Sequence, residues 1–324
     1  MTTGAGELHN KTSDLSTNVG SSGMASATLT SSVDTLAIQK SFVNDPTPPG
    51  SKVDLEFTIS NLDAALAASG LSITATLADA LPNFDWSMVI GMADDQPPEI
   101  ADRVIARQAL TYCEKPLVFC CNDADSERAI YEMALLICGG KENFEKAPTI
   151  VQYSEPISPL EYYDPAVDKM LFTVEHGIPL INFPAPQACG SAPATFAGTI
   201  VQGSAESLSG LVLAQATRPG AAFIYGAFTT IMDMQTSIFS YGAPEMSLMV
   251  GAMAQMAQFY ELPFFGTAGC TDAKFCDPQA AAEATLQCLS SAAIGSSLVH
   301  DCSSWMDHGS LVSQIGRASC RERV

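Results

Sequence analysis

The sequence of 324 residues is poor in positive charge, with 15 Lys and Arg residues against 35 Asp and Glu and a formal net charge of −20. This imbalance disfavours nucleic acids and anionic membranes as partners, because like charges repel. A cationic ligand suits the chain better. The sequence also lacks an apolar run long enough to span a bilayer and a basic segment followed by an apolar core. We therefore expect neither a membrane anchor nor a signal peptide.

The sequence also lacks Cys and His residues at the spacing typical of zinc sites. The ten cysteines are scattered. Pairs stand at Cys120 and Cys121 and at Cys270 and Cys276, but no C-x-x-C partner and no His at ligand spacing accompanies them. We therefore expect no metal site. A chain of this length needs no disulfide staples, so we interpret the cysteines as reduced thiols that serve as small apolar residues in a cytoplasmic protein.

The two ends of the chain lack the patterning of its middle. Residues 1–72 are rich in Ser and Thr and show no sustained periodicity, so we expect an irregular or mistranslated segment there. Residues 315–324 read IGRASCRERV, and their reverse translation resembles the read-through of a sequencing adapter. We interpret this tail as an artefact, the alternative being a solvated basic tail. Residues 73–314 are then one partial domain.

The middle of the chain alternates short apolar runs with helical stretches. The runs are WSMVIG, PLVFCCN, APTIVQYSEP, IPLINFPAP, AAFIYGAF, LPFFGTAG and SSLVHDCS. Their nearly continuous apolarity indicates strands buried on both faces of a parallel sheet. No G-x-G-x-x-G follows the first run, and neither a P-loop nor a G-x-S-x-G motif is present. We predict an α/β fold, a TIM-type (β/α)8 barrel incomplete at its C-terminus, with an open flavodoxin-like sheet as the alternative.

In such a barrel the reactive groups lie on the loops just after the strands. The candidates at these places are Glu155, Asn182, Tyr225, Gly226, Gly269, Cys270, Thr271, Asp272, Lys274, His300, Asp301 and Trp305. Several have ordinary structural alternatives: Asp272 and Asp277 as helix caps, and His300 with Asp301 as a core hydrogen bond. Together they place carboxylates and aromatic rings at one rim with little positive charge. That combination suits a quaternary ammonium ligand and does not resemble a phosphate site.

Long strings of the sequence resemble the trimethylamine methyltransferase family. They include YSEPISPL, GAPEMSLMVGAMAQMAQFYELP and TDAKFCDPQAAAEA, in the family's order and spacing across roughly residues 77–313. The resemblance implies a TIM-type barrel. Founding members carry pyrrolysine in the loop before a Ser/Thr-Asp-Ala-Lys segment, and here that position aligns with Gly269, before Thr271–Lys274. The chain therefore resembles the branch without pyrrolysine, whose members demethylate glycine betaine or related quaternary amines.

The resemblance implies methyl transfer from the amine to the cobalt(I) corrinoid of a separate partner protein, with no tightly bound cofactor. A quaternary amine leaves as a neutral tertiary amine, so positioning and desolvation do most of the work. We expect Asp272, Glu155 and Asp301 to complement the substrate charge as catalytic groups. The remaining candidates would bind substrate, with Tyr225 and Trp305 as aromatic walls and Lys274 and His300 holding a substrate carboxylate.

Three alternatives stay open: a tertiary amine such as trimethylamine as substrate, a non-catalytic betaine-binding protein, and a zinc-dependent methyltransferase. The sequence does not identify the amine, the corrinoid partner or the oligomeric state, and it is compatible with a homo-oligomer. Family chains have an N-terminal region that residues 1–72 do not resemble, and they continue beyond residue 313. The resemblance therefore implies a fragment with an open sheet edge, whose activity is in doubt.

Overall fold

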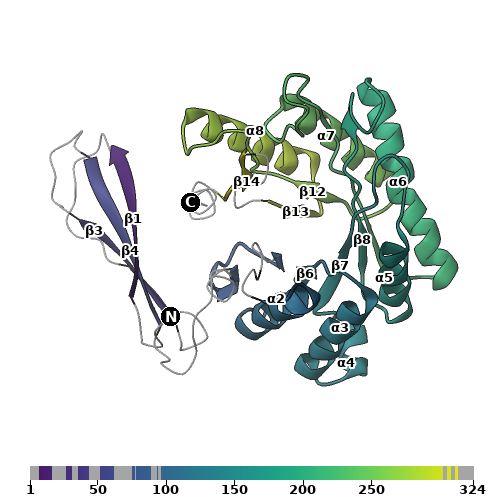
Figure 1. The fold of residues 1–324 in the computed structure, drawn as a ribbon, viewed down its shortest axis with the longest axis horizontal. Coiled ribbons are helices and arrows are strands. Elements are labelled where there is room, and N and C mark those ends of the chain that lie inside the picture. The colour runs from purple at the N-terminus through teal and green to yellow at the C-terminus, as the bar shows by residue number, and fades with distance from the viewer. Residues whose placement is uncertain are drawn as a thin grey trace. The chain divides into compact units, whose positions relative to one another are not determined.

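The computed structural model describes residues 75–76, 78–88, 93, 96–301 and 305–307 in full, and elsewhere only the backbone of strands within residues 7–61 and 311–312 (Figure 1). The chain divides into two compact units. The N-terminal unit comprises residues 1–97 and 104–115, and the α/β unit comprises residues 98–103 and 116–324. Within the part of the chain described here, every helix is too short or too polar to cross a membrane.

The N-terminal unit contains an antiparallel sheet that the sequence analysis did not predict. Its strands are β1 (Glu7–Ser16), β2 (Ala27–Thr30), β3 (Leu36–Val43) and β4 (Lys52–Asn61), in the order β1-β4-β3-β2. The prediction of an irregular segment over residues 1–72 is therefore wrong for these four stretches. Val53, Leu55, Phe57 and Ile59 alternate along β4, the period-two pattern of a strand, which the surrounding Ser and Thr residues obscured. Residues 315–324 lie outside the described part of the chain.

Beyond residue 86 the predicted alternation of strands and helices is confirmed. The elements are β5 (Ser87–Met88), α2 (Pro98–Tyr112), β6 (Leu117–Phe119), α3 (Ala124–Cys138), α4 (Lys141–Lys146), β7 (Ile150–Ser154), α5 (Asp164–Glu175), β8 (Leu180–Asn182), β9 (Gln187–Ala188), α6 (Phe196–Thr217), β10 (Phe223–Tyr225), β11 (Thr230–Ile231), α7 (Pro244–Phe259), β12 (Phe265–Thr267), α8 (Pro278–Ile294), β13 (Leu298–His300), β14 (Trp305–Met306) and β15 (Leu311–Val312). Each predicted apolar run from residue 116 onward contains one of the main strands.

The main strands of the α/β unit are parallel neighbours in chain order. Strands β6, β7, β8 and β10 pair side by side, and β12 pairs with β13. A parallel bridge between Tyr225 and Phe264 links the two groups. A doubly wound sheet would reverse its strand order, and the described strands of this unit contain no such reversal. Helices α3 and α5–α8 lie on the outer side of these strands (Figure 1).

Local chemistry explains where the helices begin and end. Asp123 caps α3 by accepting a hydrogen bond from the Ser126 N–H at 2.8 Å. Asp277 caps α8 in the same way, through the Ala280 N–H at 3.0 Å, so the structural alternative for Asp277 is confirmed. Gly139 ends α3 in the left-handed region, with φ of 78°, where glycine avoids the steric penalty of a Cβ.

The sheet is buried, as continuous apolar runs predict. Every residue of β6, β8 and β12 is buried, and Ile150, Leu180, Ile181 and Phe265 have no exposed surface. A strand in this position needs apolar or fully hydrogen-bonded side chains on both faces. Because the strands are parallel, their carboxyl ends and the loops that follow them lie at one edge of the sheet. This edge carries the candidate site.

Candidate functional site

An aromatic cluster lies at the carboxyl ends of the strands. Its members are Tyr153, Phe183, Phe228, Phe239, Tyr241, Phe265 and His300. Phe265 and His300 are stacked, with ring centroids 4.7 Å apart, and Phe183 meets Phe265 edge-on at 5.2 Å. Phe228 joins the cluster to Tyr241, at 5.1 Å. The sequence analysis selected only His300 from this group.

The rings of the aromatic cluster come from separate strand–helix units. Tyr153 belongs to β7, Phe265 to β12 and His300 to β13, while Phe183 directly follows β8. Gly226, directly after β10, leaves room for the Phe183 ring and for the backbone of Phe265. A Cβ there would lie 2.4 Å from the carbonyl oxygen of Phe265 and 2.7 Å from Cδ2 of Phe183. The predicted site residue Gly226 therefore has a packing reason to be glycine.

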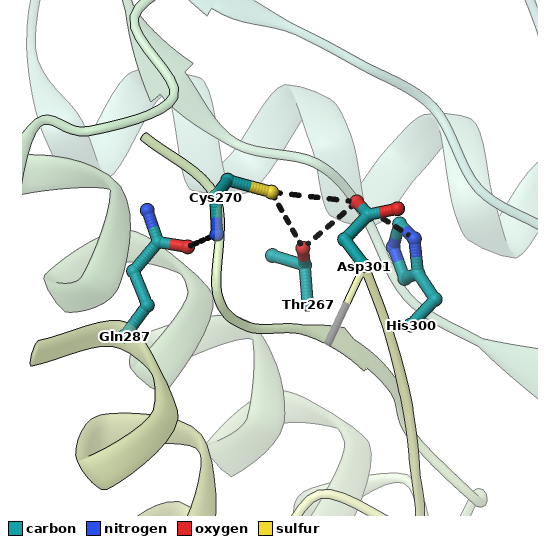
Figure 2. Close-up of polar contacts among 5 residues, drawn as sticks. All are labelled: Thr267, Cys270, Gln287, His300 and Asp301. Carbon is teal, nitrogen blue, oxygen red and sulfur yellow. Dashed lines mark hydrogen bonds and ion pairs between the residues drawn. The ribbon is translucent and has the colours of Figure 1, made fainter. Parts of the chain in front are cut away.

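Three polar side chains contact Asp301 beside the aromatic cluster (Figure 2). Its Oδ2 lies 2.9 Å from His300 Nδ1, accepts from the Thr267 hydroxyl at 3.2 Å, and contacts the Cys270 thiol at 3.6 Å. Asp301 has φ of 64°, in the left-handed region that few residues other than glycine adopt, although Asp is among those that do. Such strain persists only where surrounding contacts hold it, and it is common at functional sites.

The loop from Gly269 to Asp272 is held from two sides. The Cys270 N–H donates to Gln287 Oε1 of α8 at 2.9 Å, as Figure 2 shows, and the Asp272 N–H donates to Glu283 Oε2 at 3.0 Å. The Thr271 N–H donates to the backbone oxygen of Trp305 at 2.8 Å. Gly269 itself has φ of 81°, which explains glycine at this turn. The structure thus brings the predicted residues Gly269–Asp272 and Trp305 together.

Asp272 also fixes the aromatic cluster. Its Oδ1 accepts from the backbone N–H of Tyr241 at 2.8 Å, and the Tyr241 carbonyl accepts from the Gln287 side chain. The carboxylate therefore orients the segment that carries Tyr241. Burial raises the pKa of Tyr241, and the nearby Asp301 carboxylate raises this pKa further. The negative charge of Asp301 therefore acts on a ring of the aromatic cluster.

Glu155 and Cys120 follow β7 and β6 and are accessible to solvent. Desolvation by neighbouring protein atoms raises the pKa of Glu155, and the positive form of His300 opposes that rise. Desolvation, together with the Glu155 charge, raises the pKa of Cys120 to about 12. Burial likewise raises the pKa of Tyr153 well above its usual range, with Glu155 the next cause. These side chains share one negatively charged environment, in which neighbouring protein atoms disfavour their ionised forms.

Three predicted site residues lie elsewhere. Tyr225 is fully buried toward the helices, where its hydroxyl pairs with Ser204 of α6 at 2.7 Å. The Asn182 side chain donates to the backbone oxygen of Glu206 at 3.0 Å and holds α6 against β8. Lys274 is exposed on the loop before α8. The structure does not join Tyr225 or Asn182 to the aromatic cluster.

The aromatic residues that sequence reasoning missed had a local signal. Tyr153 and Phe183 stand at the end of an apolar run or strand, in VQYSE and INFP, whereas Phe265 is the first residue of β12, in FFGT. An aromatic residue at either position faces either the helices or the loops, and the run itself does not say which. In the part of the chain that the structure describes, no group of three or more His, Cys, Asp or Glu residues could hold a metal ion.

Comparison with known proteins gives a consistent set of relatives. A family model described as trimethylamine methyltransferase (MTTB) matches residues 69–315. Trimethylamine methyltransferase MttB2 of Methanosarcina mazei is 38% identical over 162 residues, which cover 50% of this chain and 33% of that protein. Glycine betaine methyltransferase of Desulfitobacterium hafniense is 32% identical over 168 residues, covering 52% of this chain and 35% of that protein. The chain therefore aligns with about a third of each relative's length.

Proposed function

Because this chain belongs to the trimethylamine methyltransferase family, we propose that it transfers a methyl group from a quaternary amine such as glycine betaine to the cobalt(I) corrinoid of a partner protein. Similar proteins carry the names of methyltransferases for trimethylamine and for glycine betaine. The partner supplies the corrinoid as a second substrate, so the chain itself needs no tightly bound cofactor.

The aromatic cluster beside Asp301 and Glu155 carries this proposal. A quaternary ammonium group has no N–H to donate, so it is recognised by the negative faces of aromatic rings and by nearby carboxylates. Phe265, Phe183 and Tyr241 supply the rings, and the burial of Phe265 and Phe183 makes the attraction of these two rings for a cation stronger than it is in water. The scarcity of Lys and Arg in the chain adds to the negative potential.

The candidate residues then have distinct roles. Glu155 and Asp301 complement the ammonium charge. Asp272 positions Tyr241 through its backbone N–H. His300, which Asp301 orients, binds the carboxylate of a betaine.

The reaction is an in-line displacement at one methyl carbon. The cobalt(I) electron pair forms the new cobalt–carbon bond, and the carbon–nitrogen bond breaks with its pair going to nitrogen. The amine leaves neutral, as dimethylglycine in the case of glycine betaine, so no proton and no Lewis acid is required. The protein contributes orientation and exclusion of water, to which effective molarities of roughly 10⁵ M or more are attributed in well-oriented reactions.

The fold supports the same proposal. Parallel strands that follow one another in chain order, each with a helix on the outside, are the arrangement of a TIM-type (β/α)8 barrel, and we infer that the complete family fold is such a barrel. In that fold, substrates bind at the carboxyl ends of the strands. The aromatic cluster lies at that edge.

Trimethylamine is the second candidate substrate. The relatives named for it include one at 38% identity, against 32% for the glycine betaine methyltransferase. Gly269 favours the quaternary amine, because this position resembles the one that founding family members fill with pyrrolysine. A betaine-binding protein without catalysis is the alternative of another class.

One experiment separates these functions. The purified chain is incubated with chemically reduced cob(I)alamin and either glycine betaine or trimethylamine, and the demethylated amine is quantified by mass spectrometry. We expect dimethylglycine to accumulate with the loss of cobalt(I) absorbance. Dimethylamine alone would establish the tertiary amine as substrate, and betaine binding without any product would establish the binding protein.

A further inference from the structure

Gln287 of α8 joins two segments of the candidate site that lie far apart in the sequence. Its Oε1 accepts from the Cys270 N–H at 2.9 Å, and its Nε2 donates to the carbonyl oxygen of Tyr241. Cys270 lies on the loop between β12 and α8, whereas Tyr241 lies just before α7 and belongs to the aromatic cluster. The Gln287 side chain is buried, so its loss would take a shielded hydrogen bond from each segment.

The backbone of Tyr241 is held on both sides by side chains. Its N–H donates to Asp272 Oδ1 at 2.8 Å, and its carbonyl oxygen accepts from Gln287. Asp272 is fixed in turn, because its own N–H donates to Glu283 Oε2 at 3.0 Å, which also accepts from the Thr271 hydroxyl. We call Asp272, Glu283 and Gln287 the α8 polar network. The position of the Tyr241 ring therefore depends on α8.

The segment after Tyr241 packs closely against this network. A Cβ at Gly242 would lie 2.2 Å from Glu283 Oε2 and 3.0 Å from the backbone nitrogen of Asp272. A side chain at this position would displace the Glu283 carboxylate. The close approach leaves little room for the segment to shift while the α8 polar network is intact.

The amide of Gln287 has a chemical property that the two carboxylates of the network lack. An amide donates and accepts at the same time, whereas an ionised carboxylate only accepts. The Tyr241 carbonyl needs a donor and the Cys270 N–H needs an acceptor, so one neutral amide serves both. A protonated carboxylic acid could also serve both, but its ionised form or an apolar side chain could not.

We propose that Gln287 is a positioning residue, which sets the spacing between the Tyr241 ring and the loop that carries Cys270. The Cys270 thiol contacts the Asp301 carboxylate at 3.6 Å, so this loop borders the negative charge of the site. Gln287 acts through the ring and the loop and does not touch the substrate. Its effect on methyl transfer rests on the proposed function, because an ammonium group must meet the ring and the carboxylate together.

The reactivity of the Cys270 thiol reports the position of its loop without any substrate. The full chain and Gln287→Leu are treated with iodoacetamide, and alkylation of each cysteine is followed by peptide mass spectrometry. Cys270 and Cys121 are buried, and Cys189 is exposed. We expect Gln287→Leu to raise the alkylation rate of Cys270 about tenfold and to leave those of Cys121 and Cys189 unchanged, because only the Cys270 loop is released.

Gln287→Glu tests whether the amide is needed as both donor and acceptor. The carboxylates of Asp272 and Glu283 favour the protonated form of the introduced acid. At pH 6 this variant should therefore match the parent chain, and at pH 8.5 it should behave as Gln287→Leu. The same pattern is expected for methyl transfer from glycine betaine to free cob(I)alamin, with a rate about tenfold below that of the parent chain at pH 8.5.

Ser291→Ala is the control on the same helix. It removes a buried hydrogen bond to the Ser296 hydroxyl, at 3.2 Å, away from the loops of the site, and should change neither measurement. Equal gains in alkylation at Cys121 and Cys270 in Gln287→Leu would show a general loss of stability and overturn the proposal. So would a Gln287→Glu variant that follows the parent chain at both pH values. A parent chain that transfers no methyl group, with Cys270 alkylation as expected, would defeat the proposed function alone and leave Gln287 as the residue that positions the loop.

Discussion

His300 lies flat against Phe265, with ring centroids 4.7 Å apart and ring planes 9° from parallel. The imidazole therefore packs within the aromatic cluster, and its Nδ1 also contacts Asp301 Oδ2 at 2.9 Å. One side chain thus joins the apolar and the charged parts of the site. Recognition of a betaine requires both parts, because its ammonium end suits the rings and its carboxylate end suits a cation.

Removing a ring of the cluster should weaken ammonium binding. We predict that Phe265→Leu raises the dissociation constant of tetramethylammonium about tenfold, since a desolvated cation–π contact is worth about 1–2 kcal/mol. Titration calorimetry measures this change. Tyr225→Phe is the control: it removes an aromatic hydroxyl that pairs with Ser204 outside the cluster, so it should leave the dissociation constant unchanged.

Two substitutions of Asp272 separate its positioning role from its charge. Asp272→Ala removes the acceptor for the Tyr241 N–H and should sharply lower the rate of methyl transfer. Asp272→Asn keeps an oxygen in the same place and should retain most of that rate. If both variants lose the same activity, the charge of Asp272 rather than its hydrogen bond is what the site needs.

The buried Glu127 makes stability depend on pH. Burial raises its pKa from 4.5 to about 8, and its side chain accepts from the Thr173 hydroxyl. An acid whose pKa is higher in the folded state gives stability that is fully present below the unfolded value and lost as pH rises through the folded one. We therefore predict a fall in thermal midpoint of about 3–10 °C between pH 5 and 8, as roughly 1–3 kcal/mol would give.

Calorimetric scans of Glu127→Gln check this prediction. The neutral amide keeps an oxygen acceptor for Thr173, so the fall between pH 5 and 8 should largely disappear. Glu132→Gln, an exposed position on the same helix, should retain the pH dependence of the parent chain. A parent chain whose thermal midpoint rises over this range would contradict the assignment to Glu127.

We expect the Cys120 thiol to remain unmethylated while the protein turns over substrate. A thiolate beside a methyl donor would compete with the acceptor, but desolvation raises the pKa of Cys120 to about 12, so the thiol stays protonated at neutral pH. We predict that peptide mass spectrometry after many turnovers finds no methyl group on Cys120. Stoichiometric S-methylation there would show that the thiol ionises in the presence of substrate.

Much of the α/β unit is readable from the sequence because buried parallel strands are continuous apolar runs. The strands β6, β7, β8, β10, β12 and β13 all fall within runs identified in this way. Continuity is also why the site was only partly predicted. A run that is apolar on both faces does not reveal which residues point toward the helices, so Tyr225 looked like a ligand wall and Phe265 did not.

The loop residues were easier to predict because they are polar in an apolar context. His300, Asp301 and Cys270 lie together around Thr267, which ends β12 and was not selected. The contributions of Glu283 and Gln287 come from α8, one turn apart on the helix. Their contacts with the loop depend on how α8 packs, which the local sequence does not specify.

The most direct test of ammonium recognition compares glycine betaine with its uncharged carbon analogue, 3,3-dimethylbutyrate, by titration calorimetry. The two ligands have the same shape and the same carboxylate, and they differ only in the positive charge of the nitrogen. We predict that the analogue binds about tenfold more weakly or worse, because rings and carboxylates attract the cation and not its neutral counterpart. Equal affinity for the two ligands would contradict a quaternary ammonium site in the aromatic cluster.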